Sequence, residues 1–112
     1  MAIGVGLGAF GAHGLKKFAD DYAIAIWHTA TLYLLIHAVG LIVVGAISQF
    51  DTTTIASRLT KTALLLQAGI VLFSGSLYAI ALGAPKWLGA ITPIGGISFI
   101  IAWLSLAIAI KR

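Results

Sequence analysis

Polar side chains that could do chemistry recur inside segments that are otherwise apolar enough for a lipid bilayer. Two stretches stand out: Phe73 to Tyr78, which reads Phe-Ser-Gly-Ser-Leu-Tyr, and Ile91 to Gly96, which reads Ile-Thr-Pro-Ile-Gly-Gly. Placing hydroxyl groups or open backbone in hydrocarbon without partners costs several kcal/mol per group. We therefore expect both stretches to face other helices rather than lipid.

Helical spacing predicts that the polar residues of several segments converge on one core. Tyr33 and His37 are four residues apart, and Thr29 and Gly40 extend the same stripe of an α-helix. Stripes with similar spacing occur in the next two apolar segments. The predicted polar core consists of Tyr33, His37, Gln67, Ser74, Ser76, Tyr78 and Thr92.

Two interpretations of this core remain open. Histidine titrates near neutral pH and Tyr, Ser, Thr and Gln supply donors and acceptors, so the core could be a proton relay or a small-solute site around His37. Alternatively, it is an interhelical hydrogen-bond cluster that fixes helix register, each bond contributing under about 2 kcal/mol. No carboxylate lies within the long apolar segments, which disfavours an Asp- or Glu-coupled transporter. We favour the structural interpretation.

Three classes of chemical site are disfavoured. Ser74 and Ser76 have no evident general base beyond His37 and no carboxylate to orient it, so we expect no catalytic residues and no enzyme. The chain has no cysteine and 3 histidines without close carboxylate spacing, so we expect no metal site. The stretch Gly6 to Gly11 spells G-x-G-x-x-G, but no strand precedes it, so we expect no nucleotide or other cofactor.

The glycines of the first segment suit helix packing better than nucleotide binding. Gly4 and Gly8 form G-x-x-x-G and Gly11 continues the same face, and small residues at this spacing let helix backbones approach closely in lipid. Four further residues are candidate packing or hinge positions in the polar stretches: Gly75, Pro93, Gly95 and Gly96.

Pro93 has two interpretations, which depend on where its helix begins. If the helix begins at Thr92, Pro93 lies in the first turn, where its missing N–H would be unpaired in any case. If the helix begins near Leu88, Pro93 and the following glycine pair produce a kink or a half-unwound segment.

The elements that must position these residues are membrane helices. The chain is 61% hydrophobic with a mean hydropathy of +1.10, too apolar for a water-soluble globule. Ala23–Ile47, Thr62–Leu82 and Leu88–Ile110 contain no Asp, Glu, Lys or Arg, and each meets the roughly 20 residues that a membrane span needs. Met1–Ala12 covers only about 18 Å. We predict one all-α domain over residues 1–112, a membrane bundle of four helices (about 1–14, 23–47, 62–82 and 88–110), the first short or truncated.

Charged residues flank these segments instead of forming a nucleic-acid-binding face. If the first segment counts as a crossing, the positive-inside rule compares the basic residues at the two ends of the bundle. It predicts that both termini are cytoplasmic, with Arg58, Lys61, Lys111 and Arg112 on that side and Lys16, Lys17 and Lys86 opposite.

Three aromatic residues lie near predicted span ends, where rings settle at the level of the lipid headgroups. Tyr22, Trp27 and Trp87 are therefore expected to anchor the bundle at the membrane surface.

Four ordered blocks carry a resemblance to a known family. They run Gly8 to Leu15 (Gly-Ala-Phe-Gly-Ala-His-Gly-Leu), Tyr33 to Ala38, Phe73 to Tyr78, and Thr92 to Gly96, followed by Trp103. In these blocks the chain resembles the YgdD/YwdK family, small integral membrane proteins of unknown function with a mitochondrial-type animal relative. The resemblance implies a four-helix protein of the bacterial inner membrane. It also implies about ten more apolar residues before the first block, so we expect that this chain starts at an internal methionine or is a fragment.

Two functional classes follow. The leading hypothesis is a non-enzymatic structural or envelope-integrity component that acts by helix packing in the lipid bilayer, as a homo-oligomer or with a membrane-protein partner. The alternative is a small-solute or proton pathway through the polar core around His37.

Overall fold

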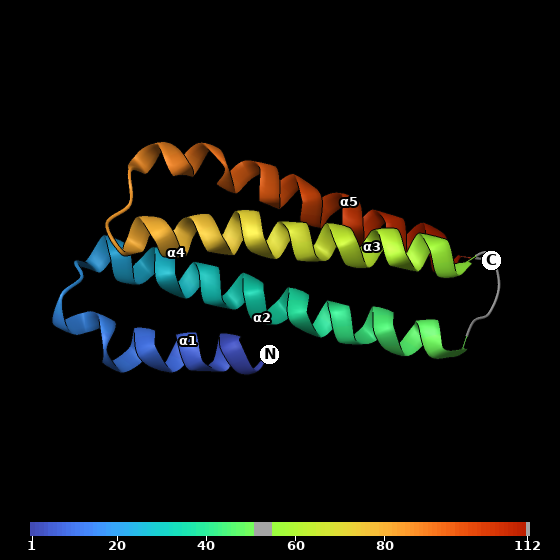
Figure 1. Cartoon of the computed structure of the whole chain (residues 1–112), viewed down its shortest axis with the longest axis horizontal. Coiled ribbons are helices and arrows are strands. Elements are labelled where there is room, and N and C mark those ends of the chain that lie inside the picture. Colours follow the sequence, from blue (N-terminus) through green and yellow to red (C-terminus); the bar gives the residue numbers. More distant parts are fainter. Residues whose placement is uncertain (51–54, 112) are drawn as a thin grey trace.

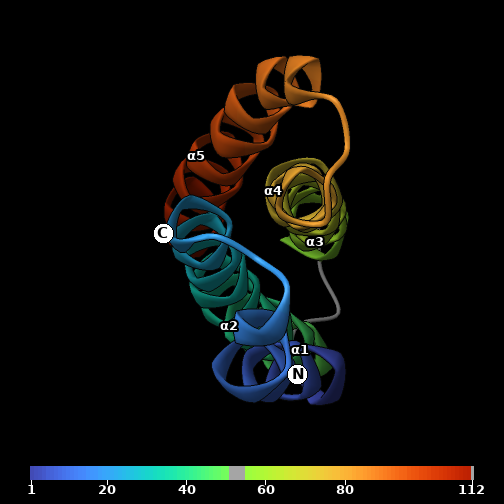
Figure 2. The ribbon, with the colours of Figure 1, turned by 90° about the vertical axis from the view of Figure 1, so that its left-hand side faces the viewer.

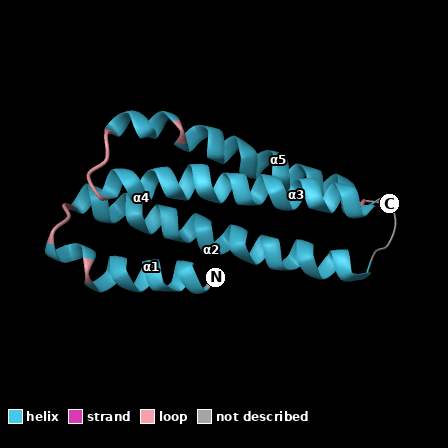
Figure 3. Ribbon diagram, in the orientation of Figure 1, coloured by secondary structure: helices cyan, strands magenta, loops and turns pink. Residues whose placement is uncertain are grey.

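The described part of the chain forms a bundle of long helices preceded by a short one, α1 (Figure 1). A computed structural model describes residues 1–50 and 55–111, and the regular elements in these ranges are helical (Figure 3). The segment 51–54, with Asp51, and Arg112 lie outside the described residues. In chain order the elements are α1 (Ala2–His13), η1 (Leu15–Lys17), α2 (Asp21–Phe50), α3 (Ile55–Gly69), η2 (Ile70–Ser74), α4 (Gly75–Ala81), η3 (Lys86–Ala90) and α5 (Thr92–Ile110).

Within residues 1–50 and 55–111, three helical segments are long and apolar enough to cross a membrane: Asp21–Phe50, Ile55–Ala81 and Lys86–Ile110. The predicted fold class, an all-α bundle with three long spans and a short first helix, is confirmed. The 30 residues of α2 extend about 45 Å, which exceeds the roughly 30 Å of a hydrocarbon core. The ends of α2 therefore reach the headgroup layers on both sides.

The short helix α1 lies along the first half of α2. Its 12 residues rise about 18 Å, and Figure 1 shows its start beside the middle of α2. The connection between the two helices is fixed at both ends. Leu15 of η1 is fully buried, and an oxygen of the Asp20 carboxylate accepts the N–H of Ala23 at 2.8 Å, which caps the first turn of α2.

The third helix is continuous from α3 through η2 to α4, but η2 is a π-helical turn. The helix starts at Ile55, before the predicted span at Thr62, because Arg58 and Lys61 limit the apolar stretch but are good helix formers. It ends at Ala81. The turn that follows contains Gly83, whose φ of 99° is favourable only for glycine, and the N–H of Ala84 bonds to the carbonyl of Ala79 at 3.0 Å.

The fourth span begins as a 3₁₀ segment and becomes an α-helix at Thr92. Pro93 therefore lies in the first turn of α5, as the first of the two interpretations expects. The N–H of Ile91 bonds to the carbonyl of Leu88 at 2.9 Å and that of Gly95 to Ile91 at 3.2 Å, so the backbone passes from one helix type to the other. This change of helix type lies near the start of the span, next to the third helix.

Small residues lie at the helix contacts, and many large aliphatic side chains lie on the outer surface of the bundle. Small residues such as Ala30, Gly69 and Ala102 are buried between helices. Large aliphatic side chains point outward along α2 and α5, where they can contact lipid. The exposed set on these two helices includes Leu32, Ile36, Val39, Ile42, Ile94, Ile97, Ile100, Leu104 and Ile108.

The third helix is central and contacts both of its long neighbours. Seen from the end where α1 joins α2, α1 lies beneath α2, and α5 lies on the side away from α1 (Figure 2). The larger apolar core joins all three long helices and contains Val44, Leu59, Leu66, Phe99, Ala102 and Leu106.

The backbones of two helices come into close contact where α5 crosses η2. A Cβ atom built on Gly95 would lie 2.8 Å from the Cα atom of Phe73 and closer still to its backbone N, and backbone atoms cannot move aside as a side chain can. A Cβ on the adjacent Gly96 would meet only the Phe73 ring, at 3.8 Å, which is ordinary contact.

We predict that Gly95→Ala destabilises the protein by about 1–3 kcal/mol more than Gly96→Ala, because only the former forces two backbones apart. Unfolding of the purified variants from mild detergent into SDS measures the difference. Equal stability of the two variants would show that this crossing tolerates a wider helix separation.

Candidate functional site

Buried hydroxyl groups join α2 to the third helix. The hydroxyl of Ser74 donates to the carbonyl of Ala30 at 2.8 Å, and the Oγ1 of Thr31 lies 2.7 Å from the hydroxyl of Tyr78. Thr31 also donates to the carbonyl of Trp27 at 3.0 Å. Because Thr31 has a single hydroxyl hydrogen, the hydroxyl of Tyr78 must donate to Thr31. We call Thr31, Ser74 and Tyr78 the α2 clasp.

A second group of hydroxyls joins the third helix to α5. The hydroxyl of Ser76 donates to the carbonyl of Phe73 at 2.9 Å and lies 2.6 Å from the Oγ1 of Thr92, so Thr92 donates to Ser76. Further along α5, Ser98 donates to the carbonyl of Leu65 at 2.7 Å. Ser76, Thr92 and Ser98 form the α5 clasp, which fixes the register of α5 on its neighbour.

His37 lies apart from both clasps, in an aromatic cluster. Its side chain is 5% exposed, and its Nδ1 lies 2.6 Å from the carbonyl of Tyr33. The imidazole stacks on Phe99 with ring centroids 3.5 Å apart and planes 12° apart, and the ring of Trp103 lies 5.8 Å away. Of the predicted polar core, the structure thus groups Ser74, Ser76, Tyr78 and Thr92 in clasps and keeps His37 with Tyr33.

Gln67 lies outside the polar core, on the exposed surface of α3. The prediction placed it with Ser74 on one face by assuming a uniform α-helix between them. The π-helical turn η2 adds one residue to the helix, which turns everything after it by about 100°. Gln67 and Ser74 therefore face different directions. Thr29 is also exposed and bonds only to the carbonyl of Ala25.

The glycines of α1 face α2. A Cβ on Gly4 would collide with the side chains of Leu34 and Leu35, one on Gly11 would collide with Trp27, and one on Gly8 would lie 3.4 Å from Thr31. Along this face, α1 packs closely against α2, as small residues at this spacing permit.

Among the remaining candidate glycines, the structure distinguishes one that packs from one that does not. Gly95 is buried against Phe73, but Gly75 is exposed and a Cβ there would meet nothing within 4 Å. Sequence reasoning did not select Gly69 as a packing glycine, although a Cβ there would collide with the Phe99 ring. Gly69 is not part of a small-residue motif, and the residue that it contacts, Phe99, lies on another helix 30 positions away in the sequence.

Trp27 is not an anchor at the membrane surface. It is 2% exposed, its indole N–H donates to the carbonyl of Leu7 at 2.8 Å, and its ring meets that of Tyr78 edge-on at 4.4 Å. The expectation was wrong because α1 covers this part of α2. Tyr22 and Trp87, by contrast, are 60% and 67% exposed.

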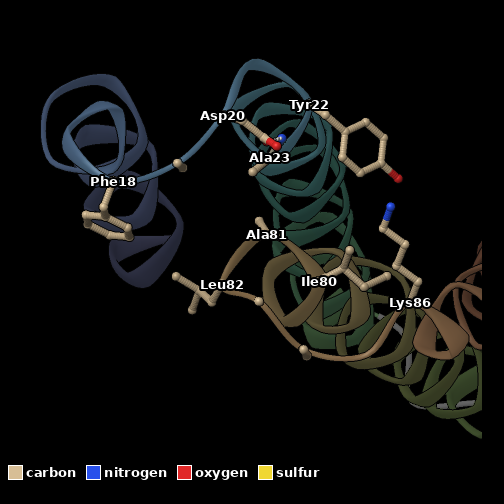
Figure 4. A pocket seen from close by; sticks show the side chains of 11 residues that line it. Phe18, Asp20, Tyr22, Ala23, Ile80, Ala81, Leu82 and Lys86 are labelled. Carbon is tan, nitrogen blue, oxygen red and sulfur yellow. Dashed lines mark hydrogen bonds between the residues drawn. The ribbon is translucent and has the colours of Figure 1, made fainter.

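A cavity of about 380 Å³ lies at the end of the bundle where α4 ends and α2 begins (Figure 4). Figure 4 shows the side chains of Tyr22 and Lys86 converging at its rim, and the Lys86 ammonium lies 5.8 Å from the Tyr22 ring. The Asp20 carboxylate at the cavity caps α2. These polar groups fix the connections between helices, and no group of three or more His, Cys, Asp or Glu gathers anywhere in residues 1–50 and 55–111.

Comparison with known proteins gives consistent matches over nearly the whole chain. Residues 7–96 match the family described as "Protein of unknown function (DUF423)". A UPF0382 membrane protein of Staphylococcus epidermidis is 53% identical over 105 residues, which cover 94% of this chain and 83% of the relative. The UPF0382 membrane protein YwdK of Bacillus subtilis is 46% identical over 107 residues, 96% of this chain and 85% of the relative. No solved structure matches.

We predict that the α2 clasp stabilises the bundle through the bond between Thr31 and Tyr78. In a double-mutant cycle of Thr31→Val and Tyr78→Phe, we expect a coupling free energy of about 0.6 kcal/mol, the average for hydrogen bonds between membrane helices. SDS unfolding measures all four variants. The pair Thr29→Val and Tyr78→Phe is the matched control, because Thr29 is exposed and bonds only within α2, and it should show no coupling. A coupling of zero for Thr31 would contradict the assigned bond.

Proposed function

This chain belongs to the DUF423 family, the UPF0382 membrane proteins that include YwdK, and we propose that it is a non-enzymatic structural component of the bacterial cell membrane. It acts by helix packing, and it supports the integrity of the envelope either as a homo-oligomer or with another membrane protein.

The state of the buried polar groups carries this proposal. In the described part of the chain, no buried side-chain nitrogen or oxygen lacks a hydrogen-bond partner. Ser74, Thr92 and Ser98 each donate to a group on another helix, and Tyr78 donates to Thr31 across the α2 interface. Such bonds fix how helices sit together in hydrocarbon, where water cannot replace them.

The same bonds disfavour catalysis by the two serines of the third helix. The hydroxyl hydrogens of Ser74 and Ser76 are both donated to backbone carbonyls. A serine nucleophile instead donates to a general base that removes its proton, and the Nδ1 of His37 is engaged by Tyr33.

A proton or solute pathway through the core has less support. It needs a continuous series of polar groups or water across the membrane. The α2 clasp, the α5 clasp and His37 instead form separate groups, and Gln67, predicted to belong to the core, is on the outer surface.

The shape of the bundle supports a partner in the membrane. Its extents are 51 × 26 × 15 Å, so it is a thin slab with a small interior. Most large apolar side chains lie on its outer faces, where a second copy or another membrane protein can pack.

For orientation, we propose that the end with Arg58, Lys61 and Lys111 is cytoplasmic. In the sequence, Arg112 follows Lys111 directly, whereas Lys16, Lys17 and Lys86 belong to the other end of the bundle. Basic residues, rather than net charge, set the topology of membrane proteins, so the two Asp residues near the first connection count little.

We predict that deleting the gene in its host raises uptake of a membrane-impermeant dye, and that the wild-type chain restores the barrier. Gly95→Leu, which forces apart the backbones of α5 and η2, should fail to restore it, and Gly75→Leu, at an open surface position, should succeed. His37→Phe should also succeed, because it keeps a ring on Phe99. Dye uptake is measured at matched amounts of protein in the membrane.

Two outcomes would remove the basis of the proposal. One is unchanged dye uptake after deletion together with a monomeric protein that cross-links to nothing in the membrane. The other is failure of His37→Phe with restoration by Gly95→Leu, which would point to a pathway at His37.

A further inference from the structure

A groove on the outer surface of the bundle opens beside His37. It lies between α2 and α5 above η2, has a volume of about 410 Å³ and is lined mainly by rings: Tyr33, His37, Phe73, Phe99 and Trp103. No Lys, Arg, Asp or Glu lines it. A pocket of this size and composition can hold one neutral, largely apolar head group.

His37 presents an unpaired acceptor to this groove. A carbonyl oxygen only accepts hydrogen bonds, so the Nδ1 of His37 must donate its hydrogen to Tyr33. In the neutral ring, the Nε2 then carries a lone pair. It has no hydrogen-bond partner, and because no buried side-chain nitrogen among the described residues lacks one, the Nε2 is not fully buried. His37 lines the groove, so we infer that the Nε2 is open to it.

Among the side chains that line the groove, Tyr33 and Trp103 carry hydrogen-bond donors, but neither is hydrogen-bonded to the Nε2 of His37. The side chain is 95% buried by its neighbours, and hydrocarbon chains of lipids carry no donors. Leaving an acceptor unpaired in hydrocarbon costs free energy, and a molecule that brings an O–H group removes this cost.

The walls of the groove define the rest of the occupant. Tyr33 and Phe73 lie with ring centroids 4.4 Å apart, and Phe99 is stacked beneath His37, so the groove offers ring faces and edges to a flat molecule. Its lack of charged residues favours a neutral molecule that dissolves in the membrane.

We propose that this groove binds the head of a membrane-soluble phenol or hydroquinone, whose hydroxyl donates to the Nε2 of His37 while its ring lies against Tyr33 and Trp103. This binding site is independent of the packing role proposed above, because it uses the Nε2 of His37, which takes no part in either clasp. It requires no chemical change in the ligand.

The test compares 4-octylphenol with its methyl ether, 4-octylanisole, which has the same ring and tail but no donor. The full chain is placed in phosphatidylcholine nanodiscs with ¹⁵N-labelled Trp and His, and the indole resonance of Trp103 reports occupation of the groove. We expect saturable binding, about fivefold tighter for the phenol, which corresponds to one hydrogen bond. The His37 Nε2 resonance should shift with the phenol alone.

Three variants separate this site from general partition into the bundle. His37→Phe should bind both compounds equally, and His28→Phe, on the exposed face of α2, should keep the preference. Gly96→Leu, which fills the groove and leaves His37 intact, should abolish saturable binding, whereas Gly75→Leu should not. Equal affinity of the wild type for phenol and ether, or unchanged binding by Gly96→Leu, would overturn the proposal even if His37→Phe fails to fold.

Discussion

The contact of α5 with the π-helical turn at Gly95 and Phe73 is the constraint on which the rest of the bundle depends. Because Gly95 has no Cβ, the backbones of α5 and η2 can come into contact. Close packing of this kind matters in lipid, because the hydrophobic effect does not drive helices together there. Once α5 lies this close, Thr92 reaches Ser76 and Phe99 reaches the open space at Gly69. The same crossing places Phe99 beneath the imidazole of His37, so helix contact and aromatic cluster have one origin.

The π-helical turn explains how one helix serves two neighbours. Before it, α3 packs its apolar face on α5, with Leu59 and Leu66 in the larger core. The added residue rotates the end of the turn and the helix that follows, so Ser74 and Tyr78 face α2 while Ser76 faces α5. A uniform α-helix would direct these hydroxyls elsewhere, and buried hydroxyls in hydrocarbon must be paired.

The clasp hydroxyls and His37 differ in how their hydrogen bonds are completed. The clasp hydroxyls complete their bonds within the protein and have the properties expected of a packing role. His37 uses one nitrogen to bond its own helix and turns the other toward the lipid-facing groove. A membrane histidine with a free acceptor is a costly residue to keep, and this separates it physically from the serines and threonines around it.

The sequence by itself determined that the chain lies in a membrane and where its helices are. Long uncharged stretches predicted the three spans, and 12 apolar residues predicted a first helix too short to cross, because hydropathy and length depend only on local composition. Tertiary structure alone decided which faces meet. Gln67 left the core because a π-helical turn changed the phase, Trp27 was buried because α1 covers it, and Gly69 gained its role from Phe99 of another helix. The burial of Trp27 and the role of Gly69 depend on neighbours distant in sequence, which no local spacing encodes. The position of Gln67 depends on a turn that breaks the uniform helical spacing from which its side of the helix was predicted.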